Sequence, residues 1–121
     1  MRILVQKFGG TSVRSAGMRA AAIDKILAAR DGGFSPVVVV SAIGRKGDPY
    51  ATDTLLHFAR SEAGGDISAR ENDLLMSCGE VISAVIMAAS LNARGAASRA
   101  VTGWQAGIYT NDRFGSAVYT E

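Results

Sequence analysis

Hydrophobic residues in the first third of the chain follow a strand period and then a helical one. The apolar segment Ile3–Lys7 ends at Gly9-Gly10 and predicts a buried strand. Apolar residues within Met18–Arg30 recur at helical spacing, and Asp31-Gly32-Gly33 ends the predicted helix. Four consecutive valines, Val37–Val40, are typical of a central parallel strand that is apolar on both faces.

The rest of the chain has the pattern of two helices, one further strand and a turn-rich end. A polar loop containing glycine and proline, Gly44–Tyr50, precedes the first of these helices, and Gly95 fits the C-terminal end of the second. We predict helices over Ala51–Arg60 and Ala69–Ala93, a strand over Ala96–Val101 and a short strand near Ala117–Tyr119.

Helices that alternate with strands in this order predict an α/β domain with a parallel sheet. Ligands of such sheets bind at the carboxyl ends of the strands. Three predicted strand ends carry small or hydroxyl residues: Lys7–Gly10, Ser41-Ala42 and Thr102-Gly103. We therefore expect a site where these three ends meet.

Composition narrows the class of protein. The 121 residues favour one domain, and 48% apolar with 20% charged residues suits a globular core. The net charge of +2 is scattered, which argues against nucleic acid as a partner. No run approaches the ~20 apolar residues that span a membrane, and no signal peptide is recognisable. The single cysteine, Cys78, favours a reducing compartment, so we expect a cytoplasmic protein.

The first strand end has the residue types of a phosphate site. Glycines at 9 and 10 allow positive φ angles and a close approach of the backbone to a ligand, and successive N–H groups then bind an anion. Lys7 adds a full positive charge, and Ser41 adds a hydroxyl group. The pattern suits a polyphosphate and the charge of a phosphoryl group in transfer. The alternative is a tight turn whose lysine points into water.

Glu80 is the only charged residue between Leu74 and Ala93. It lies almost opposite an apolar stripe made of Leu74, Leu75, Cys78, Val81, Ile82, Val85, Ile86 and Ala89. The helix is therefore expected to be largely buried, and a buried carboxylate needs a cation. That cation is either a ligand ammonium or a protein side chain; a solvated glutamate is the remaining alternative.

The other reactive side chains give weaker signals. His57 has no partner at a catalytic spacing and is expected to be an exposed helix residue. Cys78 lies on the apolar stripe and is expected to be an inert core thiol. No cluster has metal-ligand spacing.

Taken in order, five segments resemble those of aspartate kinases. They are KFGGTSV (Lys7–Val13), VVVVSAIG (Val37–Gly44), TDTLL (Thr52–Leu56), LLMSCGEVISA (Leu74–Ala84) and TGWQAGIYTND (Thr102–Asp112). Each segment alone is weak, but the ordered set spans nearly the whole chain and is specific. The loop GRKGDPYATD further resembles the monofunctional, diaminopimelate-regulated isoform.

The resemblance implies an amino-acid-kinase fold, an αβα sandwich with a parallel-rich sheet, and transfer of the γ-phosphate of ATP to the side-chain carboxylate of L-aspartate. By position, Lys7 would be catalytic, and Lys7, Phe8, Gly9, Gly10 and Ser41 would bind the phosphates of ATP. Thr52 would contact aspartate, and Glu80 would receive its α-ammonium. Mg²⁺ is expected with ATP, without ligands identified in this chain.

The family's pattern continues beyond residue 121 with nucleotide-binding residues and regulatory domains. Residues 1–121 therefore resemble an N-terminal lobe, and the isolated chain is expected to be inactive and to self-associate or require the missing half. Two alternatives remain open. One is a kinase for glutamate, acetylglutamate or UMP, and the other is a non-enzymatic module that docks on a full-length kinase.

Overall fold

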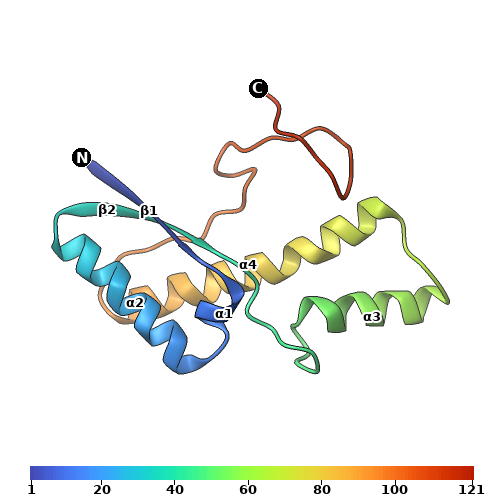
Figure 1. Cartoon of the computed structure of the whole chain (residues 1–121), viewed down its shortest axis with the longest axis horizontal. Helices are drawn as coiled ribbons and strands as arrows, with labels where there is room; N and C mark the ends of the chain where they lie inside the picture. The colour runs from blue at the N-terminus through green and yellow to red at the C-terminus, as the bar shows by residue number, and fades with distance from the viewer.

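The structure, a computed structural model, describes all residues from Met1 to Glu121. Two strands and four helices form its body, and the C-terminal part of the chain runs outside this body (Figure 1). In chain order the elements are β1 (Arg2–Phe8), α1 (Gly10–Val13), α2 (Ala16–Asp31), β2 (Phe34–Val40), α3 (Thr52–Ala63) and α4 (Ala69–Ala93). The predicted α/β class and the order of β1, α2, β2, α3 and α4 are therefore confirmed, whereas the short helix α1 was not predicted.

The two strands pair in parallel and carry helices on one face only. Their register runs from Arg2 opposite Phe34 to Phe8 opposite Val40. Side chains alternate between the two faces of a strand, and those of the covered face pack against α2 and α4. The core consists of Phe8, Val13, Ala22, Ile23, Ile26, Ile43, Met87, Leu91 and Ala96.

The second face of the sheet is bare. Ile3 and Val5 of β1 and Val37 and Val39 of β2 lie on it, with exposed fractions between 46% and 63%. The prediction that Val37–Val40 is buried on both faces is therefore wrong for these 121 residues. The valine run correctly predicted a strand. No helix of the chain covers this face, so the second helical layer of an αβα sandwich is not formed.

Helix ends are fixed by the residue types expected for them. The Ser15 and Ser68 hydroxyls accept hydrogen bonds from the backbone N–H groups of Met18 and Glu71, both at 3.2 Å. Such caps stabilise a helix by about 1 kcal/mol each. At the other end of α4, Gly95 adopts a φ of +76° and the Ala96 N–H returns to the Leu91 carbonyl at 2.9 Å. This Schellman ending confirms the predicted role of Gly95.

The orientation of α4 differs from the prediction. Gly79, Ser83, Met87 and Leu91 face the core, whereas the large apolar side chains of the predicted stripe are partly bare. Leu74, Val81 and Val85 have exposed fractions between 41% and 57%. Small residues allow the helix axis to come close to its neighbours, and a β-carbon on Gly79 would lie within 3.0 Å of Thr52 and Ala42.

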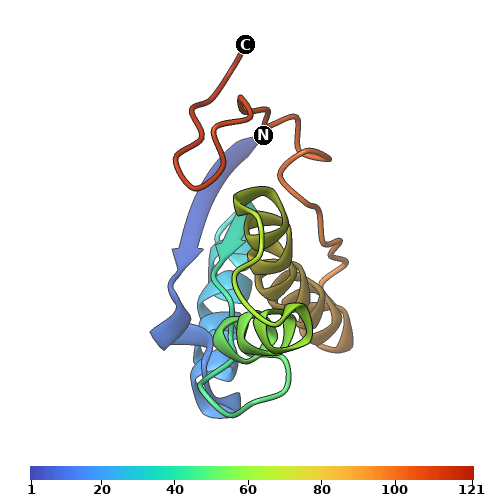
Figure 2. The same cartoon turned by 90° about the vertical axis from the view of Figure 1, so that its right-hand side faces the viewer.

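By length and composition alone, α4 would be able to cross a membrane, with a mean hydropathy of 1.9 over its most apolar 18-residue window. The prediction that no run of the chain approaches this length is therefore wrong. In the structure α4 packs against β2, α2 and α3, and Figure 2 shows it beside the other helices in one body. Length and composition alone are weak evidence for a membrane span, because a helix in the core of a protein has the same properties.

The third predicted strand, Ala96–Val101, does not form. The Asn92 side chain is hydrogen-bonded to both backbone groups of Ser98. It accepts from the Ser98 N–H at 2.8 Å and donates to the Ser98 carbonyl at 3.0 Å. A cavity of about 260 Å³ separates the segment from β2. The predicted strand near Ala117–Tyr119 is likewise reduced to one antiparallel bridge between Thr110 and Tyr119.

Candidate functional site

The carboxyl ends of β1 and β2 lie against each other. The Ser41 N–H donates to the Phe8 carbonyl at 3.1 Å, which extends the pairing by one residue past β2. Gly10 lies next to Ala42, the residue after Ser41. A β-carbon placed on Gly10 would be 3.3 Å from the Ala42 carbonyl oxygen. Two of the three predicted strand ends therefore meet as expected.

Helices α3 and α4 also meet at Ala42. A β-carbon placed on Gly79 would lie 2.7 Å from Oγ1 of Thr52 and 3.0 Å from Cβ of Ala42. Thr52 is the first residue of α3, and Gly79 precedes Glu80 in α4. Ala42 is thus the centre of a junction, which we call the Ala42 junction, formed by Lys7–Gly10, Ser41-Ala42, Thr52 and Gly79-Glu80.

A closed loop delivers Thr52 to this junction. A β-carbon on Gly44 would overlap the backbone of Ala51, so the two ends of the loop touch and position 44 has room only for glycine. Within the loop, the Asp48 carboxylate accepts from the Arg45 N–H at 2.8 Å. Because Ala51 is buried, the residue that follows it starts α3 from a fixed point.

The polar side chains of the junction are not engaged within the chain. Lys7, Ser41, Thr52 and Glu80 take part in none of the side-chain hydrogen bonds. The four ion pairs of the chain also leave Lys7 and Glu80 out. The Lys7 ammonium, the Glu80 carboxylate and the hydroxyls of Ser41 and Thr52 therefore have no side-chain partner within the chain.

Three details of the predicted site are corrected. Gly9 adopts an extended φ of −69°, and neither Gly9 nor Gly10 has a positive φ, so close approach rather than backbone conformation explains Gly10. The Phe8 side chain belongs to the core, and only its carbonyl reaches the junction. Glu80 is exposed, not buried, so burial does not force a cation upon it.

The third predicted strand end, Thr102-Gly103, is not part of the Ala42 junction. Thr102 and Gln105 bond to each other, with the Thr102 N–H donating to the Gln105 side chain at 2.9 Å. The segment that follows is held to α4 by one hydrogen bond, from the Gly115 N–H to the Asp73 carboxylate. Figures 1 and 2 show this segment outside the body of helices and strands.

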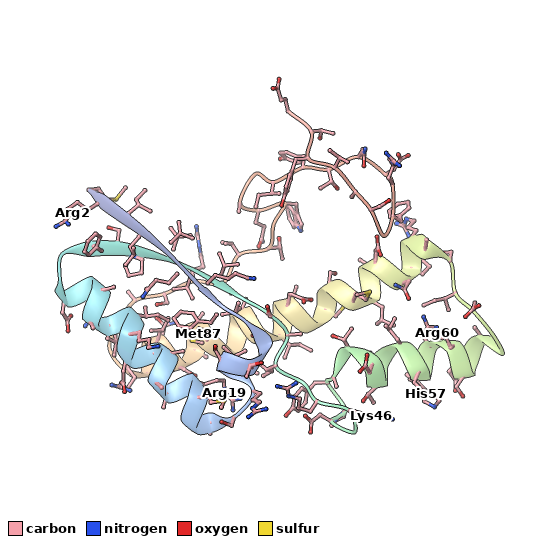
Figure 3. The ribbon with its side chains drawn as sticks, in the orientation of Figure 1. Arg2, Arg19, Lys46, His57, Arg60 and Met87 are labelled. Atoms are coloured by element: carbon pink, nitrogen blue, oxygen red, sulfur yellow. The ribbon has the colours of Figure 1, made fainter.

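The weaker candidates lie elsewhere. Figure 3 shows His57 on the side of α3 turned away from α4, and His57 is exposed as predicted. Cys78 is exposed, so the prediction of a core thiol is wrong; the rotation of α4 towards Gly79 leaves it outside. No group of three or more His, Cys, Asp or Glu side chains gathers anywhere in the chain.

Sequence reasoning placed Ala42 at a strand end of the expected site but missed Gly79, the residue of α4 that meets it. A signal for Gly79 was present, because a glycine within an apolar helix lowers helix stability and so points to a close contact. Ala42 carries no such signal. Its importance comes only from the residues that the fold brings around it.

Comparison with known proteins defines the class. The pattern of the amino acid kinase family matches residues 2–118. The chain therefore belongs to the amino acid kinase family.

Individual relatives within this family are aspartokinases. The chain is 50% identical over all 121 residues to aspartokinase 1 of Bacillus subtilis and 40% identical over 117 residues to an aspartokinase of Geobacillus stearothermophilus. It spans 30% and 27% of these relatives, respectively. The solved aspartate kinase of Synechocystis matches 76% of the chain with a TM-score of 0.64 and 37% identity, and the chain covers 15% of that structure.

Proposed function

We propose that residues 1–121 form the aspartate-binding, phosphate-contacting lobe of an aspartate kinase. Its reaction would transfer the γ-phosphate of ATP to the side-chain carboxylate of L-aspartate and give 4-phospho-L-aspartate. The observation that carries the proposal is the Ala42 junction, where the side chains of Lys7, Ser41, Thr52 and Glu80 have no partner within the chain. The aspartokinase relatives supply the substrate.

Each group at the junction has a proposed task. Lys7 would neutralise the charge that spreads over the phosphoryl oxygens during transfer. The backbone at Gly9 and Gly10 and the Ser41 hydroxyl would hold the phosphates. Thr52 would contact aspartate, and Glu80 would bind its α-ammonium. The acceptor carboxylate is ionised at neutral pH, so no general base is required and positioning carries much of the rate.

Magnesium would enter with the nucleotide. Mg²⁺ is held mainly by substrate phosphates and waters with one or two carboxylates, and residues 1–121 gather no cluster of carboxylates. We therefore assign it no ligand in this chain. The single cysteine and the resemblance support a cytoplasmic enzyme. The resemblance of the Gly44–Asp53 segment supports a role in lysine and diaminopimelate biosynthesis, on the route shared with threonine and methionine.

The activity is tested in a chimaera in which residues 1–121 replace the matching segment of aspartokinase 1 of Bacillus subtilis. We expect ATP turnover that depends on aspartate, because the junction brings its own acceptor groups to the rest of that enzyme. Glutamate, acetylglutamate and UMP should not replace aspartate. The 121-residue chain alone should show no turnover in the same coupled assay. A chimaera that accepts one of the other substrates, or none, would contradict the proposal.

The bare sheet face supports self-association of the chain in isolation. Val5 and Val37 are register partners on that face, and contiguous apolar surface favours association. We expect light scattering to report a mass above that of the 12.6 kDa monomer, increasing with concentration. Val5→Lys with Val37→Lys should restore the monomer, whereas Ala20→Lys, on the exposed side of α2, should not. A wild-type chain that stays monomeric at high concentration would refute this.

A further inference from the structure

We propose that Gly79 is a positioning residue, whose missing side chain sets where the Thr52 hydroxyl lies relative to Glu80. The inference rests on the proposed function, since a bound aspartate is what gives Thr52 and Glu80 a common ligand. Gly79 precedes Glu80 in α4 and faces the Ala42 junction. An increase in its size therefore acts directly on the Thr52 hydroxyl, next to the residue that carries the Glu80 carboxylate.

The contact around Gly79 leaves no room for a methyl group. A β-carbon there would lie 2.7 Å from Oγ1 of Thr52 and 3.0 Å from Cβ of Ala42. Ala42 has little freedom to move aside, because the preceding residue is hydrogen-bonded to the end of β1 and Gly10 lies against the Ala42 carbonyl. The Thr52 hydroxyl has no hydrogen bond to hold it. Rotation about its χ1 angle to another staggered position therefore relieves the clash first and moves the hydroxyl away.

Local conformation gives no other reason for glycine at this position. Gly79 lies in the interior of α4 and has no positive φ, so alanine would suit the backbone and raise helix propensity. Gly17, near the start of α2, has nothing within 4 Å of an added β-carbon. The close contact at position 79 is therefore a property of the junction and not of helical glycines in this chain.

Gly79→Ala in the chimaera tests this inference. We expect KM for aspartate to rise on the order of tenfold to a hundredfold, as misplaced contact groups do, with a smaller change in KM for ATP. Gly17→Ala is the matched control and should leave both constants unchanged. Adding Ala42→Gly removes one of the two obstructing atoms, so the double variant should recover part of the affinity for aspartate.

A second readout does not depend on turnover. In the 121-residue chain, the NMR couplings that report χ1 of Thr52 should change in Gly79→Ala and remain as in the wild type in Gly17→Ala. A structural role alone would lower the melting temperature and the active fraction but leave KM unchanged. An active chimaera whose Gly79→Ala variant keeps its KM for aspartate overturns the positioning role alone. A wild-type chimaera without aspartate-dependent turnover overturns the proposed function, and this inference with it.

Discussion

Replacing Lys7 with methionine should lower kcat of the chimaera on the order of 10²–10³-fold, the loss typical when one stabilising donor is removed from a transition state. Methionine keeps most of the length of the lysine side chain but removes its charge. Lys7 lies on the exposed sheet face in register with Val39 and makes no ion pair. Its charge is therefore not required by the fold, and the melting temperature should stay unchanged.

The matched control for Lys7 is Lys25→Met, which removes an exposed positive charge from α2. The Lys25 side chain makes no ion pair, and the one side-chain hydrogen bond that reaches Lys25 runs from Gln6 to its backbone carbonyl. We expect kcat to remain at the wild-type value in this variant. Lys7→Arg should recover only part of the rate, because a planar guanidinium does not reproduce the compact charge of an ammonium. A Lys7→Met chimaera with wild-type kcat would remove Lys7 from the mechanism.

Replacing Glu80 with glutamine should weaken binding of aspartate with little change in stability. A hydrogen bond to a charged group contributes about 1.5–3 kcal/mol, which corresponds to roughly tenfold to a hundredfold in KM. Glu80 is exposed and has no ion pair within the chain, so its loss leaves no buried group unsatisfied. Steady-state kinetics with varied aspartate measure the effect.

Two comparisons make the Glu80 test specific. Glu62→Gln removes a carboxylate from the exposed end of α3, where it makes no ion pair, and should leave KM unchanged. Succinate lacks the α-ammonium of aspartate, so the wild-type chimaera should bind it poorly and the Glu80→Gln chimaera should discriminate less between the two. Equal discrimination by both proteins would show that Glu80 does not receive the ammonium.

The sequence predicted the elements better than their orientation. Serine caps and terminal glycines are local signals, so α4 runs from Ala69 to Ala93 as expected. Which face of α4 packs inward is decided by its neighbours. Gly79 approaches Ala42 and the start of α3, whereas Leu74, Val81 and Val85 of the apolar stripe remain exposed. Hydrophobic periodicity alone favours the opposite orientation.

The predicted third strand failed for a similar reason. Its β-strand pattern is satisfactory, but Asn92, six residues before Ser98, takes both backbone groups of Ser98 that a strand ladder would use. Such a contact depends on the geometry after the end of α4. In the site, the strand-end rule correctly predicted that the ends of β1 and β2 meet, which they do at Phe8 and Ser41. No local pattern predicted that α3 and α4 meet at Ala42 through Thr52 and Gly79.

Because Gly44 and Ala51 are in contact, the position of α3 does not depend on the length of the loop between them. Residues between them project outward as a self-contained excursion, and Figure 3 shows Lys46 at its outer side. Related enzymes could lengthen, shorten or decorate this excursion without displacing Thr52. A fluorescent label or a short peptide tag inserted there would report on the neighbouring acceptor groups while leaving their geometry intact.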